Sequence, residues 1–390
     1  MRSSRLLAPL LVAVSAMTLA GCAGAAPTAA PAASATPSAT RTPTPTPTPI
    51  DPLAAWVDER MAGLSTQQKA AAMLMLHAPG TDPAPSRALI DAGASGVILM
   101  GDNIAGDAPS LAALTAALVA DPELPPLIGV DQEGGEVSRL DWDAAASAAT
   151  LRDAPPAATR EAFAARAASV AAGGANVNFG VIADVTGDPG SFISGRVLGT
   201  DPAGAAERVA AAVAGERGTV ASTLKHFPGH GGAPGDSHTS IPTAPSSLAE
   251  WRAGPALPFA AGIDAGAELV MTGHLAYPAV DAAPASLSPE WHRILRDELG
   301  FEGVVITDDM LMLQHNGLAE YADPGENAVR AVAAGADLLL YVLPADPSEF
   351  GISVDGLVAS ITTAVDSGRI SEERLDDAVR HVLTLRRSLA

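Results

Sequence analysis

Ionisable side chains follow a series of short apolar segments along the chain. They are Asp131, Asp184, Lys225, His226, His274, Asp308 and Asp309. A single aspartate after a strand is usually the cap of the next helix. Several such residues that meet at one edge of a parallel sheet can instead act as nucleophile, general acid or general base. The spacing therefore predicts an active site, provided that the apolar segments form one sheet.

These apolar segments alternate with alanine-rich stretches of helical character. The strands that we expect cover residues 72–76, 97–100, 127–130, 177–183, 221–224, 269–272, 304–307 and 338–342. Continuous apolar strands separated by helices indicate a parallel sheet that is covered on both faces. Eight such units favour an α/β fold with a single closed (β/α)8 barrel of the TIM type. The alternative is an open doubly wound sheet, but no G-x-G-x-x-G motif follows the first strand.

Composition narrows the choice of partners. The formal net charge of -21 disfavours nucleic acid and anionic lipid surfaces, because both would repel the protein. A neutral substrate fits this charge better. The only cysteine is Cys22, so the chain forms no intramolecular disulfide and no zinc site built on thiolates.

The first 50 residues carry features of export. Arg2 and Arg5 precede a largely apolar stretch over residues 6–19, and Leu19-Ala20-Gly21-Cys22 resembles the bacterial lipobox. We therefore expect a lipoprotein signal peptide over residues 1–22, lipid attachment at Cys22, and a secreted protein anchored to the cell surface. The alternative is an ordinary secretory signal. Residues 23–50 are almost wholly Ala, Pro, Ser, Thr and Gly, which predicts a disordered, extended linker before a catalytic domain over residues 51–390.

Several motifs together resemble one enzyme family. The most specific is Lys225-His226-Phe227-Pro228-Gly229-His230-Gly231, followed by Asp236-Ser237-His238. Supporting segments are Gly129 to Gly135, Gly195-Arg196 before Asp201-Pro202, Pro284 to Pro289 and Val305 to Met310. The chain is similar, from about residue 53 to residue 386, to bacterial β-N-acetylhexosaminidases of glycoside hydrolase family 3. The resemblance implies a glycosidase that works without a cofactor or a metal ion, and we expect a monomer.

The resemblance also implies roles for three residues. Asp308 corresponds to the carboxylate that attacks the anomeric carbon and forms a covalent glycosyl-enzyme. His238, oriented by Asp236, corresponds to the general acid and base, and the ordinary pKa of histidine near 6.5 suits that task. Asp309 is a rival nucleophile by adjacency alone, but we expect it to cap the next helix or to bind a neighbouring group.

Further residues are expected to hold the terminal sugar. By resemblance they are Asp131, Arg139, Arg196, Lys225 and His226, with His274 and Met310 as additional wall residues. We expect His230 to support its own loop and Asp184 to orient a neighbour. The sequence departs from the family pattern at Glu136, where a basic residue is common, and at Val181, near which the family often has a proline.

Other functions remain open at this point. A barrel-mouth zinc hydrolase would draw its ligands from His226, His230, His238, His274 and Asp308. A lipoprotein solute-binding receptor would share the anchor and linker, and a phosphorylase of the same family would share the site. β-Glucosidase relatives carry a second domain that donates a glutamate. We expect none after the helix over residues 371–385, which favours release of N-acetylglucosamine from peptidoglycan fragments or chitin oligosaccharides.

Overall fold

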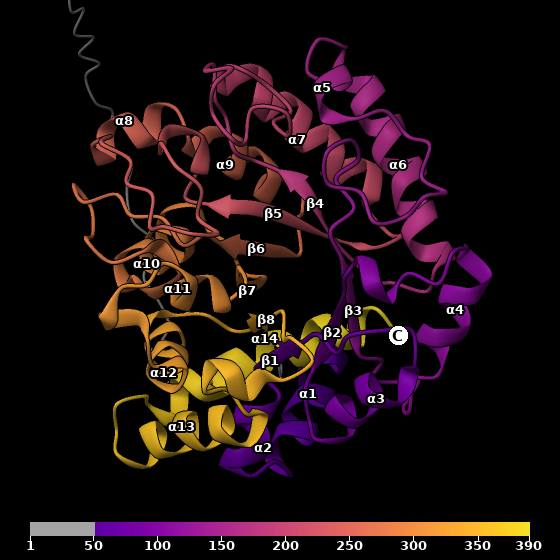
Figure 1. Ribbon diagram of the computed structural model, residues 1–390, viewed down its shortest axis with the longest axis vertical. Helices are drawn as coiled ribbons and strands as arrows, with labels where there is room; N and C mark the ends of the chain where they lie inside the picture. Colours follow the sequence, from indigo (N-terminus) through magenta and orange to yellow (C-terminus); the bar gives the residue numbers. More distant parts are fainter. Residues whose placement is uncertain (1–50) are drawn as a thin grey trace, which may run out of the picture. The chain divides into compact units, whose positions relative to one another are not determined.

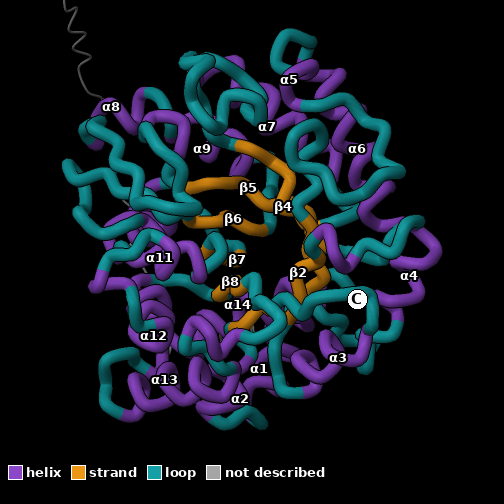
Figure 2. The backbone as a smooth tube through the Cα atoms, in the orientation of Figure 1, coloured by secondary structure: helices purple, strands orange, loops and turns teal. Residues whose placement is uncertain are grey.

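The computed structural model describes residues 51–390, which form a barrel of parallel strands surrounded by helices (Figures 1 and 2). The predicted (β/α)8 fold is confirmed. The signal peptide, the lipidation of Cys22 and the linker predicted for residues 1–50 lie outside the described residues. None of the described helices is both long enough and apolar enough to cross a membrane.

Eight strands build the barrel wall. They are β1 (Leu74–Leu76), β2 (Gly96–Leu99), β3 (Leu127–Val130), β4 (Val177–Ile182), β5 (Ala221–Phe227), β6 (Leu269–Thr272), β7 (Val304–Thr307) and β8 (Leu339–Tyr341). Neighbouring strands pair in parallel in the order β7-β6-β5-β4-β3-β2-β1-β8. A parallel bridge between Ile306 and Leu338 joins β7 to the start of β8, so the two ends of the sheet meet.

The boundaries of β5 and β1 differ from the expected ones. β5 continues past residue 224, because Lys225 pairs with Ile182 of β4 and Phe227 pairs with Thr272 of β6. Lys225 and His226 therefore lie within the strand and not after it. β1 starts at Leu74, later than expected, because Ala72 still caps the preceding helix.

Helices follow the strands and cover the outside of the barrel (Figure 2). They are α1 (Pro52–Ala62), α2 (Thr66–Ala71), α3 (Pro83–Asp91), α4 (Ala108–Ala116), α5 (Ala148–Leu151), α6 (Pro156–Ala172), α7 (Pro202–Glu216), α8 (Leu248–Ala253), α9 (Ala256–Asp264), α10 (Pro289–Arg293), α11 (Leu311–His315), α12 (Pro324–Ala334), α13 (Val354–Asp366) and α14 (Glu372–Ser388). Asp51, Asp82, Asp201 and Asp323 each cap a helix whose first residue is proline. The aspartate side chain accepts a hydrogen bond from a backbone N–H group in the first turn, and proline has no N–H group that would need a partner there. The Asp-Pro pair therefore starts these helices.

The interior of the barrel is filled with apolar side chains. Alternate strand residues such as Met75, Phe179 and Ile306 form this inner cluster, and Val382 of α14 packs against it. Gly129 of β3 faces the same cluster. A Cβ atom there would lie 2.5 Å from Phe179 Cε2 and 2.7 Å from Met75 Cε, so only glycine fits. The packed interior leaves the carboxyl ends of the strands as the place for a site.

Candidate active site

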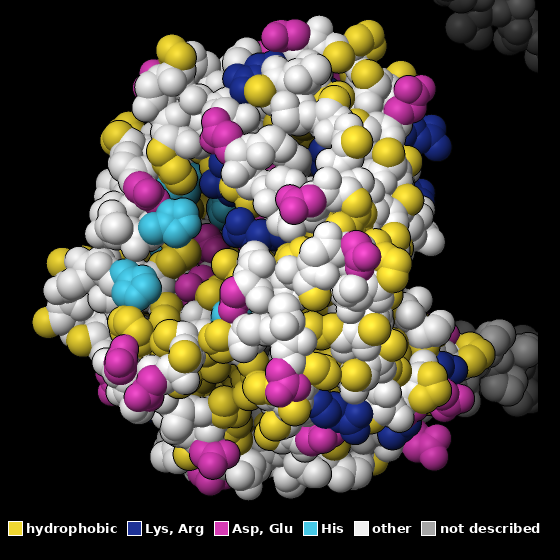
Figure 3. Space-filling view, turned by 45° about the vertical axis from the view of Figure 1, so that its right-hand side comes forward, with side chains coloured by type: hydrophobic (Ala, Val, Ile, Leu, Met, Phe, Trp, Pro, Cys, Tyr) yellow, Lys and Arg dark blue, Asp and Glu magenta, His cyan; other side chains and the backbone are white. Residues whose placement is uncertain are grey.

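A cavity of about 200 Å³ opens at the carboxyl ends of the strands. Acidic, basic and histidine side chains gather in a hollow of the surface (Figure 3). The ionisable side chains that line the cavity are Asp131, Glu133, Arg139, Arg196, Lys225, His226, His238, Asp308 and Asp309. All five residues expected to hold the sugar are among them, and so are the expected nucleophile and His238. Apolar side chains of the barrel interior, among them Met271 and Leu340, also line it.

The sugar-binding candidates form a compact network of charges. Lys225 Nζ lies 2.7 Å from Asp131 Oδ1 and 2.8 Å from Glu133 Oε1. Arg196 donates two hydrogen bonds to Glu133, of 2.8 Å to Oε2 and 2.7 Å to Oε1. The guanidinium of Arg139 approaches Asp131 to 3.9 Å. Such a set of charged donors and acceptors suits the hydroxyl groups of a sugar.

Glu133 lines the cavity, although the sequence analysis assigned it no role. It is 2% exposed, and burial alone would raise its pKa. The charges of Lys225 and Arg196 outweigh burial and hold the pKa below its ordinary value, so Glu133 is ionised at neutral pH. Its position two residues after Asp131, past the end of β3, is the signal that could have identified it, because alternate residues of an extended chain face the same side.

Asp308 directly follows β7. Its main-chain N–H donates to Thr272 O at 2.9 Å, which continues the pairing of β6 and β7, and its Oδ1 accepts the Asp309 N–H at 2.8 Å. Burial would raise the pKa of Asp308, but the charges of His226 and His274 and the bond from the Asp309 amide lower it below the ordinary value. A partly buried carboxylate that stays ionised is what a nucleophile requires.

Asp309 has a different environment. Its Oδ1 accepts backbone N–H groups from Leu311 at 3.1 Å and from Val342 at 2.9 Å, and its carbonyl oxygen lies 2.9 Å from His274 Nε2. Burial raises the pKa of Asp309 to about 7, and the two backbone bonds only partly offset it. Asp309 thus connects the start of α11 with the chain after β8, while Asp308 keeps the ionised carboxylate.

Asp184, which lies shortly after β4, contacts two histidines of the motif that spans residues 225–231. It is fully buried, with Oδ2 at 2.7 Å from His226 Nδ1 and Oδ1 accepting the His230 N–H at 2.5 Å. Burial would raise the pKa of Asp184, but the charge and hydrogen bond of His226 lower it. Since Nδ1 of His226 is engaged, its Nε2 is the nitrogen available to a ligand. The ring of His230 packs edge-on against Phe192, with centroids 4.5 Å apart, so it supports its loop.

The proposed acid–base pair lies on the loop after β5. His238 Nδ1 is 2.5 Å from Asp236 Oδ1, and the His238 N–H donates to the same oxygen at 3.0 Å. The side chains are 64% and 48% exposed, whereas Asp308 is only partly exposed. Burial would raise the pKa of Asp236, but its hydrogen bonds with His238 lower it. The structure thus brings His238 to the same cavity as Asp308, from an exposed loop.

Met310 and His274 do not lie where they were expected. Met310 is 1% exposed and packs in the core cluster beneath α11, because its N–H continues the strand pairing by donating to Leu340 O. Met312, the second residue of α11, lines the cavity instead. His274 is fully buried behind the wall, with its ring nitrogens 2.7 Å from Ser286 Oγ and 2.9 Å from Asp309 O.

The histidines do not assemble into a metal site. Within residues 51–390, no group of three His, Cys, Asp or Glu side chains is arranged to hold a metal ion. His226 and His274 are engaged with Asp184, Ser286 and Asp309, as described above. The geometry therefore does not supply the ligand set that a zinc hydrolase needs.

Comparisons with known proteins agree with this geometry. The model of the glycosyl hydrolase family 3 N-terminal domain matches residues 65–385. A β-hexosaminidase of Stenotrophomonas maltophilia (strain K279a) is 37% identical over 296 residues, which cover 72% of this chain and 85% of that protein. The structure of a family 3 β-N-acetylglucosaminidase from Paenibacillus sp. str. FPU-7 matches with a TM-score of 0.77 at 34% identity, over 84% of this chain. The chain spans only 63% of that protein.

A second structure matches over nearly its whole length. The β-N-acetylhexosaminidase from Beutenbergia cavernae DSM 12333 gives a TM-score of 0.72 at 30% identity, over 83% of this chain and 99% of that one. Sequence, fold and the arrangement of charged side chains at the barrel mouth all lead to the same assignment. The chain belongs to glycosyl hydrolase family 3 and is a glycoside hydrolase.

Proposed function

We propose that the protein is a retaining exo-β-N-acetylhexosaminidase that releases terminal N-acetylglucosamine. The observation that carries this proposal is a single small cavity lined by both Asp308 and His238. Its volume of about 200 Å³ is below that of most ligand pockets, which suits one terminal sugar better than an internal segment of a glycan. The two β-hexosaminidase relatives of similar length support the choice of sugar.

In the first step, a carboxylate oxygen of Asp308 forms a bond to the anomeric carbon while the bond to the leaving oxygen breaks. His238 gives its Nε2 proton to that oxygen, so the aglycone departs as a neutral alcohol. Asp236 stabilises the proton on Nδ1 and thereby orients the ring. In the second step, His238 takes a proton from water, and the water oxygen replaces Asp308 at the anomeric carbon with net retention.

The charged network fixes the sugar during both steps. Lys225 and Arg196 are held by Glu133, so their remaining N–H groups are directed before substrate arrives. Asp131 supplies acceptors, and Arg139 and His226 supply further polar contacts from the wall. Each charge-assisted hydrogen bond to a hydroxyl group contributes about 1.5–3 kcal/mol when buried.

Substrate choice is tested first. The purified protein is expected to release 4-nitrophenol from the N-acetyl-β-glucosaminide without added metal, and far more slowly from the β-glucoside. A preference for the glucoside would contradict the proposal. Adding inorganic phosphate separates the phosphorylase alternative, because a phosphorylase would then yield the sugar 1-phosphate in place of the free sugar.

The nucleophile is tested by trapping. A 5-fluoro N-acetylglucosaminyl fluoride should label the enzyme covalently, and peptide mass spectrometry should place the label on Asp308. Asp308→Ala is expected to lose nearly all turnover. A label on Asp309, or an active Asp308→Ala variant, would overturn the assignment.

The general acid is tested by varying the leaving group. His238→Ala should lose least activity with acidic phenol leaving groups, because these need little protonation, and most with alkyl or sugar leaving groups. An equal loss across all leaving groups would count against His238.

We further propose that the protein acts outside the cytoplasm as a lipoprotein attached through Cys22. Its substrates would then be peptidoglycan fragments or chitin oligosaccharides. Cys22→Ser should move the protein from the membrane fraction to the soluble fraction without changing its activity. Membrane association of Cys22→Ser would refute the anchor.

A further inference from the structure

The segment after β3 carries several cavity residues on one short loop. Asp131, Glu133, Val137 and Arg139 all line the cavity. The loop is closed by its own backbone, since Glu133 N and Gly134 N both donate to Val137 O, at 3.1 and 3.0 Å. Something must therefore fix this loop relative to the barrel, because it sets the positions of four wall residues at once.

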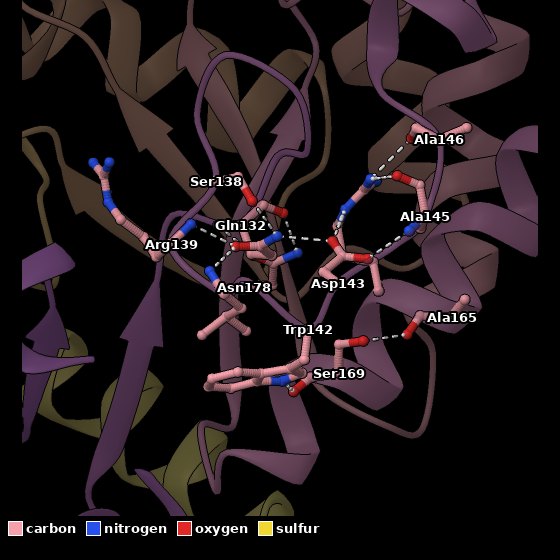
Figure 4. A network of polar contacts seen from close by, with 12 residues as sticks. Gln132, Ser138, Arg139, Trp142, Asp143, Ala145, Ala146, Ala165, Ser169 and Asn178 are labelled. Atoms are coloured by element: carbon pink, nitrogen blue, oxygen red, sulfur yellow. Dashed lines mark hydrogen bonds and ion pairs between the residues drawn. The ribbon is translucent and has the colours of Figure 1, made fainter. Parts of the chain in front are cut away.

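Gln132 lies between two of these wall residues but does not line the cavity. It is fully buried, and its side-chain amide bridges the two ends of the loop (Figure 4). Oε1 accepts the main-chain N–H groups of Arg139 at 2.8 Å and Leu140 at 3.0 Å. Nε2 donates to Ser138 Oγ and Asp143 Oδ2, both at 2.8 Å. The amide therefore forms all four hydrogen bonds that a glutamine side chain can make.

Asn178 of β4 holds the main chain of the same residue. Its Oδ1 accepts the Gln132 N–H at 3.2 Å, and its Nδ2 donates to Gln132 O at 3.1 Å. Nδ2 also donates to Glu216 Oε1 at 2.6 Å, which ties the contact to the end of α7. Both side chains of this pair are fully buried within the protein. Gln132 is thus fixed from two sides, through its side chain and through its backbone.

The far end of the network is anchored in the outer layer. Arg166 of α6 donates from Nε to Asp143 Oδ2 at 2.9 Å, and the side chains are 0% and 1% exposed. The same guanidinium donates to Ala146 O at 2.9 Å. Neither Asp143 nor Arg166 lines the cavity. The network therefore connects the sugar-binding wall to the packed helices without contacting the ligand itself.

We propose that Gln132 and Asn178 are positioning residues for sugar binding. Gln132 directly follows Asp131, and its side chain bonds the main chain of Arg139. It therefore fixes the distance between the side chains of Asp131 and Arg139 in the wall of the cavity. The proposal rests on the proposed function, because it assigns these wall residues to the sugar. Asp308, His238 and Asp236 belong to other strands and loops, so loosening the β3 loop should weaken binding more than it slows the chemical steps.

The chain offers a matched control at the other end of β3. Asn176 makes a similar pair of backbone contacts, since its Oδ1 accepts the Ile128 N–H at 2.7 Å and its Nδ2 donates to Pro126 O at 2.9 Å, but it lacks the bond that Asn178 donates to Glu216. It lies at the opposite end of the strand from the cavity. Asn176→Ala and Asn178→Ala therefore both remove an asparagine contact between β3 and β4, but only the second touches the loop of the site.

The experiment compares these variants of the full chain on 4-nitrophenyl N-acetyl-β-glucosaminide. Asn178→Ala and Gln132→Met should raise KM about tenfold, which corresponds to about 1.4 kcal/mol of binding, with kcat within about threefold of the wild type. Asn176→Ala should leave KM unchanged, even if it lowers the melting temperature as much. An unchanged KM in folded Asn178→Ala, or an equal rise in Asn176→Ala, would overturn the proposal.

Amide hydrogen exchange gives a second readout that needs no turnover. Residues 131–140 should exchange faster in Asn178→Ala than in the wild type, and should not change in Asn176→Ala. An inactive wild type would contradict the proposed function, while the exchange data would still decide the positioning role. If Asn178→Ala fails to fold, Gln132→Met decides the question alone, because a Met side chain makes none of the four hydrogen bonds of the amide; unchanged exchange and KM in that variant would refute the proposal.

Discussion

Replacing Glu133 by Gln should destabilise the protein through one buried charge. The side chain keeps its shape, but Lys225 and Arg196 lose an anion at 2.8 and 2.7 Å. Lys225 retains Asp131, whereas Glu133 is the only carboxylate within ion-pair distance of Arg196 among residues 51–390. Removing one partner of a buried pair costs about 3–5 kcal/mol. We expect the lower end, about 3 kcal/mol, because the amide oxygen still accepts a hydrogen bond.

Urea unfolding measures this loss, and the chain contains a matched surface pair as control. Arg369 donates two hydrogen bonds to Glu326, at 2.9 and 2.7 Å, in the same forked arrangement, but both side chains are about half exposed. Glu326→Gln should change the free energy of unfolding little, because water screens the pair. Equal losses in the two variants would show that burial does not govern the effect.

Acid should diminish the difference between the wild type and Glu133→Gln. The pKa of Glu133 lies below its ordinary value of 4.5, because Lys225 and Arg196 outweigh the effect of burial. Its contribution to stability is therefore complete above pH 4.5 and is lost as the pH falls through the lowered pKa. A difference in unfolding free energy that stays constant or grows between pH 6 and pH 3.5 would refute the reasoning.

Three further predictions follow from the same geometry. Burial raises the pKa of Asp309 from 3.8 to about 7, so the wild type loses stability as the pH rises across this interval. The free energy of unfolding of Asp309→Asn, measured in urea, should therefore rise relative to that of the wild type between pH 4 and pH 7. A difference between the two proteins that stays constant with pH would contradict the shift. Met310→Ala should cost about 2–5 kcal/mol of stability and leave KM unchanged in the folded enzyme, whereas Met312→Ala should raise KM. Asp236→Asn should lower kcat and move its pH dependence, because the pair with His238 loses its charge, while melting curves should hardly change at this exposed site.

Much of the site could be predicted because barrel topology converts strand order into proximity. Asp131, Lys225 and Asp308 are far apart in sequence, but each lies at the carboxyl end of its strand, and parallel strands place those ends at one rim. The fold itself followed from eight apolar segments separated by helices. These are regularities of backbone geometry, and they do not depend on individual side-chain contacts.

Side-chain direction beyond the strand ends could not be predicted in the same way. Met310 was expected in the wall of the cavity. Its N–H group instead donates to Leu340 O of β8, which continues the pairing of the strands, and the turn into α11 brings Met312 to the cavity. Glu133 had no assigned role because its ion pairs with Lys225 and Arg196 form only when the folded barrel brings these residues together. The position of His274 behind the wall likewise depends on Ser286, which lies twelve residues further along the same connection between β6 and α10.

The two halves of the chemistry differ in how freely they can evolve. The proposed nucleophile, Asp308, directly follows β7 at the rim of the packed barrel, so its surroundings tolerate little change. The proposed proton donor, His238, lies instead on a solvent-exposed, glycine-rich loop. Under the proposed mechanism, substitutions or insertions in that loop change the leaving-group preference while the side chains around the sugar keep their positions.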